Sequence, residues 1–541
     1  MKKIFLLAGF AMLTSCATLQ NNSKPNFTWE GANMYFLLTD RFANGDKNND
    51  VNFGRTEKAA VLRGFEGGDL RGIIQKIDEN YFTDLGINAI WMTPVVEQIH
   101  GATDEGTGDT YGFHGYWAKD WTALDPNFGT KADLKELVEK AHAKGIRIVL
   151  DAVVNHTGPV TATDPVYPAS WVRTSPQCQY NNYQNTTACT LVANLPDVIT
   201  ESDAAAELPQ MLVDKWRSEG RYETEMKSLD EFFARTGYPK APKYYIMKWL
   251  ADYVQEFGID GYRVDTVKHT NEDVWKDFQL ICQEAFDIYK TENPAKVLDN
   301  NLFFMVGEVY GYGISQKQDY NFGDKKVNYY QNGFKSLINF DFKGDANKTY
   351  DELFSDYSKL LHSDLNGKTV MNYLTSHDDG SPFDKDRKRT YESATKLLLA
   401  PGISQVYYGD ETARDLTIEG TTGDATLRSN MNWSDVKYNP GTKKLLEHYQ
   451  KLGKFRANHP AVGAGVHQVV SAAPYWFTRT YQNDVVLVGL DLNSGLKTVS
   501  VTGIFEGGTK VRDAYSGKTS KVENGRISFD TEFSIVLVEK I

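Results

Sequence analysis

Short apolar segments alternate with amphipathic helices along most of the chain, from about residue 32 to about residue 455. Eight of these segments have the length and the content of β-branched and aromatic residues that buried strands have. They are residues 32–40, 87–94, 146–156, 259–267, 302–310, 336–342, 369–378 and 403–411. The segment 131–145 is typical of the helices between them, since its apolar residues recur at i, i+3, i+4 and i+7 and Gly145 ends it. Eight strand-then-helix units imply parallel strands with right-handed crossovers, so the pattern predicts an α/β fold with a (β/α)8 TIM barrel.

Two segments depart from this alternation. Residues 157–240 are rich in Tyr, Asn, Thr and Pro and interrupt the pattern between the third and fourth predicted strands. After about residue 455 the chain changes to short β-rich runs separated by turn residues, which predicts a terminal antiparallel β domain. We therefore expect a barrel at 31–156 and 241–455, an inserted B domain at 157–240 and a C-terminal β domain at 456–541.

The N-terminal segment reads as an export signal. Two lysines precede an apolar run at 4–13, and small residues lead to Cys16. The run is too short to span a membrane, and its ending "LTSC" resembles a bacterial lipobox, in which cleavage leaves a lipidated Cys16. We expect residues 1–15 to be a signal peptide, 16–30 a linker, and the protein to be exported and lipid-anchored to an outer membrane or cell surface. The alternative is an ordinary cleaved signal and a periplasmic or secreted protein.

Composition narrows the classes of partner. With 541 residues, 41% of them hydrophobic, the chain can bury a large core, and its net charge of −12 makes nucleic-acid binding a poor expectation. We expect a monomer that contacts a membrane only through its lipid anchor. Cys178 and Cys189 lie close together in a loop-like stretch, where export permits a disulfide, although two free thiols are the alternative. Cys282 lies in a predicted helix and is most simply a buried apolar residue.

Ionisable and amide side chains cluster at the ends of four predicted strands. These residues are Asn155, His156, Arg263, Asp265, Glu308, His377 and Asp378. In a (β/α)8 barrel the C-terminal strand ends converge on one mouth, so groups scattered along the sequence meet in space. The alternative is that each is a separately satisfied polar residue. The repetition on four strands favours a shared site.

A pair of carboxylates facing one pocket is the machinery of glycoside cleavage. Asp265 suits the nucleophile, because Arg263 two residues earlier would favour its charged form and lower its pKa. Glu308 lies in the apolar stretch "FFMVGEVY", which would raise its pKa and keep it protonated for the acid role.

Four motifs carry a family resemblance. "DAVVNH", "GYRVDTVKH", "GEVY" and "YLTSHDD", in this order, resemble the four signature regions of the α-amylase family, glycoside hydrolase family 13. "MYFLLTDRFANGD", "GINAIWMTP", "YGFHGYWAKDW" and "VYYGDE" add to the resemblance, which runs from about residue 30 to 455. It implies a catalytic barrel, an inserted B domain and a C-terminal antiparallel β-sandwich. One departure is Ser376, which stands where the family usually has Asn before the His-Asp pair.

The resemblance also implies roles for individual residues. Asp265 is the expected nucleophile, Glu308 the general acid/base and Asp378 the third carboxylate, while Asp151 orients Arg263. The expected sugar contacts at the cleavage site are Arg263, His114, Tyr116, His156 and His377, with Tyr116 as stacking platform. Farther out, the expected contacts are Lys268 and His269 on the leaving-group side, and Asp424 and Arg428 at the next sugar on the non-reducing side.

Calcium is the expected cofactor. A loop with oxygen donors resembles a calcium loop of the family, with the carbonyl of Gly67 and the side chains of Asn44, Asp46, Asn49, Asp50 and Asp69 as ligands. A polar turn without metal is the alternative. A second calcium ion would use Asn155, Asp197 and the carbonyl of His269, although one usual ligand has no clear counterpart near Thr187.

These observations predict a retaining, endo-acting α-amylase that hydrolyses α-1,4-glucosidic bonds in starch and maltooligosaccharides. Two alternatives stay open. One is a neopullulanase- or cyclomaltodextrinase-like hydrolase, or a glucan transglycosylase, with the same chemistry. The other is a non-catalytic glucan-binding homologue, which the presence of all three carboxylates disfavours.

Overall fold

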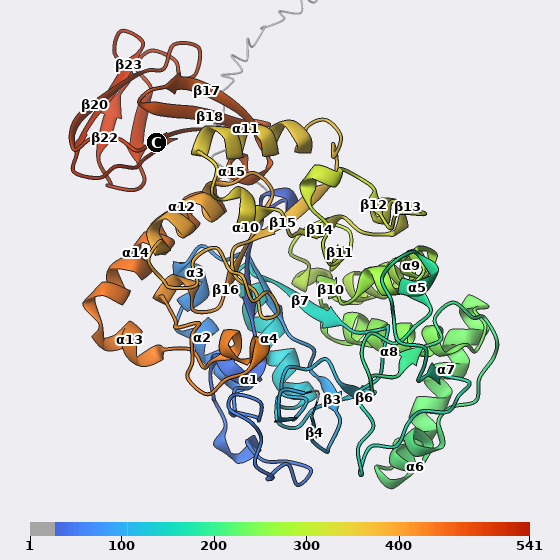
Figure 1. The fold of residues 1–541 in the computed structure, drawn as a ribbon. Helices are drawn as coiled ribbons and strands as arrows, with labels where there is room; N and C mark the ends of the chain where they lie inside the picture. Colours follow the sequence, from blue (N-terminus) through green and yellow to red (C-terminus); the bar gives the residue numbers. More distant parts are fainter. Residues whose placement is uncertain (1–26, 105) are drawn as a thin grey trace, which may run out of the picture.

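Eight parallel strands close into a barrel in a computed structural model of the chain, which describes residues 27–104 and 106–541 (Figure 1). The strands are β1 (Asn33–Leu37), β2 (Ala89–Met92), β7 (Arg147–Ala152), β10 (Gly261–Val264), β11 (Phe304–Gly307), β14 (Ser336–Asn339), β15 (Thr369–Tyr373) and β16 (Ile403–Tyr407). They pair in this order around the barrel, and β16 closes on β1. The predicted (β/α)8 barrel is confirmed.

The strands are shorter than the apolar runs that predicted them. Every residue of β1 and of β7 is buried, because a parallel barrel has side chains filling its interior and helices covering its outside. The run predicted at 146–156 leaves the sheet after Ala152, and the run at 369–378 leaves it after Tyr373. The residues that follow these strand ends are therefore free to form the mouth of the barrel.

Helix α4 (Lys131–Ala143) shows how the sequence pattern sets the outer layer. Thr130 and Asp133 form a reciprocal capping box at its start, and the predicted apolar stripe is buried. Gly145, just beyond the helix, has φ of +73°, which a glycine adopts without the steric cost of a side chain. The other long helices around the barrel are α2 (Leu70–Asp78), α8 (Pro242–Phe257), α9 (Glu272–Glu292), α11 (Tyr350–Leu361), α12 (Thr390–Leu399) and α14 (Pro440–Asn458).

One barrel unit differs from the prediction. Within the described residues, β11 is followed by no α-helix but by short 3-10 turns and the hairpin β12 (Tyr320–Asn321) and β13 (Lys326–Val327). The sequence between β11 and β14 is rich in Gly, Tyr, Asn and Gln and lacks the apolar period of a helix.

Two excursions stand between barrel strands. The longer one, between β7 and α8, contains β8 (Val172–Arg173), α5 (Gln184–Thr187), β9 (Asp197–Val198), α6 (Gln210–Ser218) and α7 (Tyr222–Thr236). A disulfide joins Cys178 and Cys189 in it, and Cys282 is a buried free thiol in α9. The shorter excursion, between β2 and α4, pairs β3 (Val96–Gln98) with β6 (Ala118–Leu124) and was not foreseen from the sequence.

The C-terminal part is an antiparallel sandwich (Figure 1). Its six-stranded sheet contains β17 (Val466–Ala472), β18 (Tyr475–Tyr481), β19 (Asp484–Leu490), β24 (Val536–Lys540), β21 (Lys510–Asp513) and β22 (Thr519–Lys521). The pair β20 (Gly495–Ser500) and β23 (Arg526–Thr531) faces it, and apolar residues of both sheets, such as Trp476 and Phe529, form one cluster. The predicted C-terminal β-sandwich is confirmed.

The N-terminal predictions fall mainly outside the described residues. The signal at 1–15 and Cys16 lie there, together with most of the predicted linker. Of the linker's described end, Trp29 is buried and its ring stacks on Phe304 with centroids 3.9 Å apart. No helix in residues 27–104 and 106–541 has the length and apolar character needed to cross a membrane.

Candidate active site

Arg263 is the hub of the barrel mouth. Its guanidinium lies 2.9 Å from an oxygen of Asp151, 2.7 Å from Asp265 and 3.0 Å from Glu308, and its side chain is 1% exposed. Asp151 on β7 also accepts hydrogen bonds from Trp91 Nε1 at 3.1 Å and Tyr116 Oη at 2.8 Å. One buried cation therefore holds the carboxylates of three neighbouring strands at one point.

The turn after Asp265 is strained. Thr266 has φ of +50°, a left-handed conformation that is costly for a β-branched residue. In this conformation the Thr266 N–H donates to Glu308 Oε2 at 3.0 Å, and the neighbouring Val267 N–H donates to the Glu308 carbonyl. The strained turn thus fixes the carboxylate of Glu308 relative to that of Asp265.

The protonation of the two central carboxylates follows from burial. Burial, together with the charges of Asp265 and Asp378, raises the pKa of Glu308 to about 7 against the opposing effect of Arg263. Burial also raises the pKa of Asp265, although Arg263 works in the other direction. Arg263 lowers the pKa of Asp265 as expected, but burial and the charges of Asp151 and Asp378 outweigh it, so the net shift is upward.

Asp378 has the opposite environment. Arg428 Nη2 lies 2.5 Å from Asp378 Oδ1, and His377 Nε2 lies 2.9 Å from Asp378 Oδ2. Desolvation works against ionisation, but His377 and Arg428 hold the pKa of Asp378 well below its usual range. Burial thus raises the pKa of Asp265 and of Glu308, whereas Asp378 is held in its ionised form.

Aromatic and imidazole rings line the wall beside the carboxylates. The ring of Tyr116 stacks on His377 with centroids 5.3 Å apart and lies 5.8 Å from His114. His156 Nε2 donates to the carbonyl of Tyr116 at 3.1 Å, and its buried Nδ1 has no hydrogen-bond partner within the described part of the chain. Burial lowers the pKa of His156 to about 4, so this ring is neutral at physiological pH.

Arg63 is a site residue that the sequence analysis missed. It donates to Asp424 Oδ1 at 2.9 Å and to the carbonyl of Thr422 at 2.8 Å, while Asp424 also pairs with Arg428. The link from Arg63 through Asp424 and Arg428 reaches Asp378. No local pattern could have found it, because Arg63 and Asp424 are 361 residues apart.

Two of the three carboxylates, Asp265 and Asp378, line one cleft of about 900 Å³. Its lining includes Arg63, His114, Tyr116, His156, Gln177, Leu191, Val192, Asp265, Tyr310, Asp378, Asp424 and Arg428. Polar donors, carboxylates and aromatic faces together suit a chain of sugars, which offers hydroxyls at its edges and apolar ring faces.

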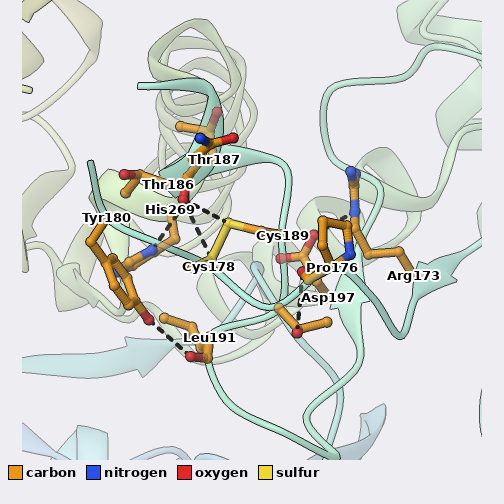
Figure 2. Close-up of a disulfide and its surroundings, with 12 residues drawn as sticks. Arg173, Pro176, Cys178, Tyr180, Thr186, Thr187, Cys189, Leu191, Asp197 and His269 are labelled. Carbon is orange, nitrogen blue, oxygen red and sulfur yellow. Dashed lines mark hydrogen bonds and ion pairs between the residues drawn. A yellow bond between two sulfur atoms is a disulfide. The ribbon is translucent and has the colours of Figure 1, made fainter. Parts of the chain in front are cut away.

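Lys268 and His269 follow the strained turn. Lys268 Nζ donates to the carbonyl of Tyr310 at 3.0 Å and lies 5.2 Å from the centre of the Tyr310 ring. His269 is buried and its Nδ1 donates to the carbonyl of Thr186, beside the disulfide (Figure 2). Lys268 is thus hydrogen-bonded to the loop after β11, and His269 to the segment after β8.

The first expected calcium loop has a donor set that fits a hard cation. Asn49 Oδ1 is buried without a hydrogen-bond partner among the described residues. Asn44 Nδ2 donates to Asp50 Oδ1, and a Cβ on Gly67 would come within 2.7 Å of that oxygen, so these groups close around Gly67. Asp69 accepts from backbone N–H groups of the same loop. No group of three or more His, Cys, Asp or Glu side chains in residues 27–104 and 106–541 is arranged around a metal, so amide and carbonyl oxygens would complete this site.

The second expected calcium set fits less well. Asp197 Oδ1 has no hydrogen-bond partner in the described structure, and Asn155 Oδ1 accepts from Thr270 at 3.2 Å. Arg173 Nε, however, lies 2.8 Å from Asp197 Oδ2 (Figure 2). A divalent ion on this carboxylate would sit against a guanidinium, so the set does not fit calcium.

Comparisons with known proteins agree with this geometry. Residues 36–465 match the family Alpha-amylase, described as "Alpha amylase, catalytic domain". The chain is 35% identical over 528 residues to the periplasmic alpha-amylase of Escherichia coli (strain K12), covering 87% of this chain and 73% of that protein. It is 27% identical over 504 residues to the cyclomaltodextrin glucanotransferase of Geobacillus stearothermophilus, covering 90% of this chain and 62% of that protein.

A solved Anoxybacillus alpha-amylase has the same fold, with a TM-score of 0.64 and 25% identity over 95% of this chain and 99% of that one. Family match, identity and barrel geometry agree: the chain belongs to the alpha-amylase family and is a glycoside hydrolase.

Proposed function

We propose that this protein is a retaining, endo-acting α-amylase that hydrolyses α-1,4-glucosidic bonds in starch and maltooligosaccharides. The observation that carries the proposal is the meeting of Asp265 and Glu308 on one buried guanidinium, beside a cleft that Asp265 and Asp378 line. The similarity to the Escherichia coli periplasmic alpha-amylase supports the substrate class.

The mechanism follows from the protonation states. Glu308 donates its proton to the glycosidic oxygen while Asp265 attacks the anomeric carbon, so the C–O bond breaks and a covalent glycosyl–enzyme ester forms. Glu308, now a carboxylate, takes a proton from water, whose oxygen attacks the same carbon and releases Asp265. Two inversions leave the anomeric configuration unchanged. Asp378, kept ionised by His377 and Arg428, accepts hydrogen bonds from sugar hydroxyls.

We assign the sugar contacts from the cleft. His156 and His114 are neutral hydrogen-bonding groups, Tyr116 gives a ring face, and Asp424 with Arg428 suits the next sugar on the non-reducing side. Lys268 and His269 suit the leaving-group side, where Lys268 reaches the Tyr310 loop.

A second candidate function is glucan transfer or cyclodextrin cleavage. It is favoured by the exposed ring of Tyr310 in the cleft, which could hold an acceptor sugar in place of water, and by the similarity to a cyclomaltodextrin glucanotransferase.

Product analysis on amylose, pullulan and cyclodextrin separates these functions. Amylose cleaved fastest, into linear maltooligosaccharides, supports the amylase; faster cleavage of pullulan or cyclodextrin overturns this choice. The Glu308→Gln variant is the control, and must be inactive on all three.

We also propose one calcium ion rather than two, held by the side chains of Asn44, Asp46, Asn49, Asp50 and Asp69 and by the carbonyl of Gly67. Export to the periplasm or cell surface agrees with the periplasmic relative. A lipid anchor on Cys16, a monomeric state and the domain limits given above remain proposals from the sequence.

A further inference from the structure

The loop closed by Cys178 and Cys189 lies against the catalytic cleft. The two cysteines are bonded, and Cys178 N–H and Thr190 N–H donate to the carbonyls of Thr190 and Pro176 at 2.9 Å each (Figure 2). Gln177, just before the first cysteine, and Leu191, just after Thr190, line the same cleft as Asp265 and Asp378. The disulfide therefore ties together the two ends of a segment that forms part of the cleft wall.

The tip of the same loop holds His269. The Thr186 carbonyl accepts from His269 Nδ1 at 3.1 Å, and the ring of Tyr180 meets the imidazole edge-on with centroids 5.7 Å apart. Because His269 is 5% exposed, this contact fixes the orientation of its ring. The loop thus positions a residue on the proposed leaving-group side.

The outer face of the loop is anchored as well. Tyr183 N–H donates to Asp324 at 2.9 Å, Tyr183 Oη donates to Glu272 at 2.5 Å, and Lys325 lies 3.7 Å from the centre of the Tyr183 ring. These contacts reach α9 and the β12–β13 hairpin, so the loop bridges the parts of the mouth built by β10 and β11. Between these anchors the disulfide is the covalent link across the loop, beside backbone hydrogen bonds and the bond from Tyr180 Oη to the Leu191 carbonyl.

From these contacts we infer that the Cys178–Cys189 disulfide is a specificity-determining element, and that its oxidation state sets how well long glucans bind. The inference rests on the proposed function. A dithiol such as dithiothreitol would transfer two electrons and two protons to the disulfide, giving two cysteine thiols and the cyclic oxidised dithiol. The opened loop would then no longer form a fixed part of the cleft wall or hold the ring of His269 in place. Arg263, Asp265 and Glu308 would keep their contacts with one another.

The test compares a long substrate with a short one. Amylose fills the cleft on both sides of the cleavage point, whereas 4-nitrophenyl α-maltotrioside leaves a single small ring on the leaving-group side. In the Cys178→Ser/Cys189→Ser variant we expect kcat/KM on amylose to fall about 10-fold, mainly through KM. Release of nitrophenol from the short substrate should change less than about 2-fold. In the wild-type protein, dithiothreitol should lower kcat/KM on amylose while leaving nitrophenol release nearly unchanged. In the double variant it should change neither quantity further.

The control is Cys282→Ala, which removes the buried thiol of α9 and should keep full activity and full sensitivity to dithiothreitol. Equal losses on both substrates would overturn the inference, because they indicate general loosening of the fold, and so would no loss on amylose. If the double variant does not fold, the dithiothreitol titration of folded wild-type protein decides in the same way. Failure of the untreated wild type to cleave either substrate would instead overturn the proposed function.

Discussion

At the residue scale, the protonation of the site depends on three carboxyl groups that lie around a single guanidinium. Arg263 is one buried cation facing Asp151, Asp265 and Glu308, so the three cannot all ionise without leaving uncompensated charge in the barrel. Burial raises the pKa of all three carboxyl groups, to about 6 for Asp151 and to about 7 for Glu308. Glu308 accepts one backbone N–H besides Arg263, whereas Asp151 also accepts from Trp91 and Tyr116.

The pH dependence of kcat/KM follows from this arrangement. Glu308 must be protonated to act as acid, and its pKa of about 7 lies above the usual carboxyl value. Activity should therefore be present below pH 7 and fall as the pH rises through it, while protonation of Asp265 lowers activity on the acid side. A pH profile of amylose hydrolysis checks this.

In Glu308→Gln, kcat should fall by about 10³-fold and the basic limb near pH 7 should vanish. A basic limb that persists unchanged in the variant would assign it to another group.

Arg63 should act on binding and not on chemistry. It is buried, and its partner Asp424 is the residue that we assign to the next sugar on the non-reducing side. In Arg63→Gln, KM on maltooligosaccharides should rise about 5–30-fold, the loss of one charge-assisted pair, with kcat within about 3-fold. Asp424→Asn is the matched variant and should give a similar rise. A drop in kcat at constant KM would place Arg63 in the catalytic step instead.

The residue-scale chemistry was predictable only where it depended on local pattern. Asp265, Glu308 and Asp378 could be found because each follows an apolar strand, and strand ends meet at one mouth of a barrel. The net direction of the pKa shift of Asp265 could not be predicted, since it depends on how deeply the barrel mouth buries this carboxyl group and which charges surround it. Arg63 could not be predicted either, because its partner Asp424 is remote in sequence.

At the scale of elements, the sequence pattern predicted the strands and helices that occupy the repeated positions of the barrel. Helix α4 has the apolar period that its place on the outside of the barrel demands, and strand β1 is a continuous buried run, as a parallel barrel strand is. The β3–β6 pair and the missing helix after β11 were not predicted, because short irregular segments carry no period and are fixed by what they pack against. The proposed calcium loop is also a short irregular segment, although its donor residues were predicted, and its stability should depend on the ion that we propose.

Removal of calcium should destabilise the loop around Gly67. Chelation of the wild-type protein should lower its melting temperature by about 2–5 °C, since an ion bound to the folded state alone adds about 2–3 kcal/mol at 100 times its Kd. Asp50→Ala should melt at the chelated temperature and not respond to added calcium. Lys47→Ala, in the same loop, has no oxygen ligand to lose and should respond as the wild type does. A wild-type protein insensitive to chelation would exclude a structural ion here.

At the scale of the whole molecule, barrel and C-terminal sandwich are joined by a charged cluster. His459, at the end of α14, lies 2.8 Å from Asp484 on β19 and 2.8 Å from Glu539 on β24, and Arg512 pairs with the same Glu539. Burial opposes protonation of the imidazole, but the two carboxylates raise the pKa of His459 to about 9. The imidazolium is thus a bridge between the two parts.

This bridge should make stability depend on pH. A raised folded-state pKa stabilises the protein fully below the unfolded value near 6.5, and the contribution is lost as the pH rises through 9. Urea denaturation from pH 6 to 10 should show a fall on the order of 3 kcal/mol in the wild type and a flatter profile in His459→Gln. Parallel profiles of the two proteins would contradict the account.

The central claim, that Asp265 and Glu308 perform a double displacement on an α-glucan, is tested most directly by the configuration of the first product. Proton NMR of the reducing ends formed from amylose, recorded before mutarotation, reads it. A double displacement gives the α-anomer first and the β-anomer only later, by mutarotation, and we expect no product from Glu308→Gln. Initial formation of the β-anomer would show a single displacement by water and would contradict it.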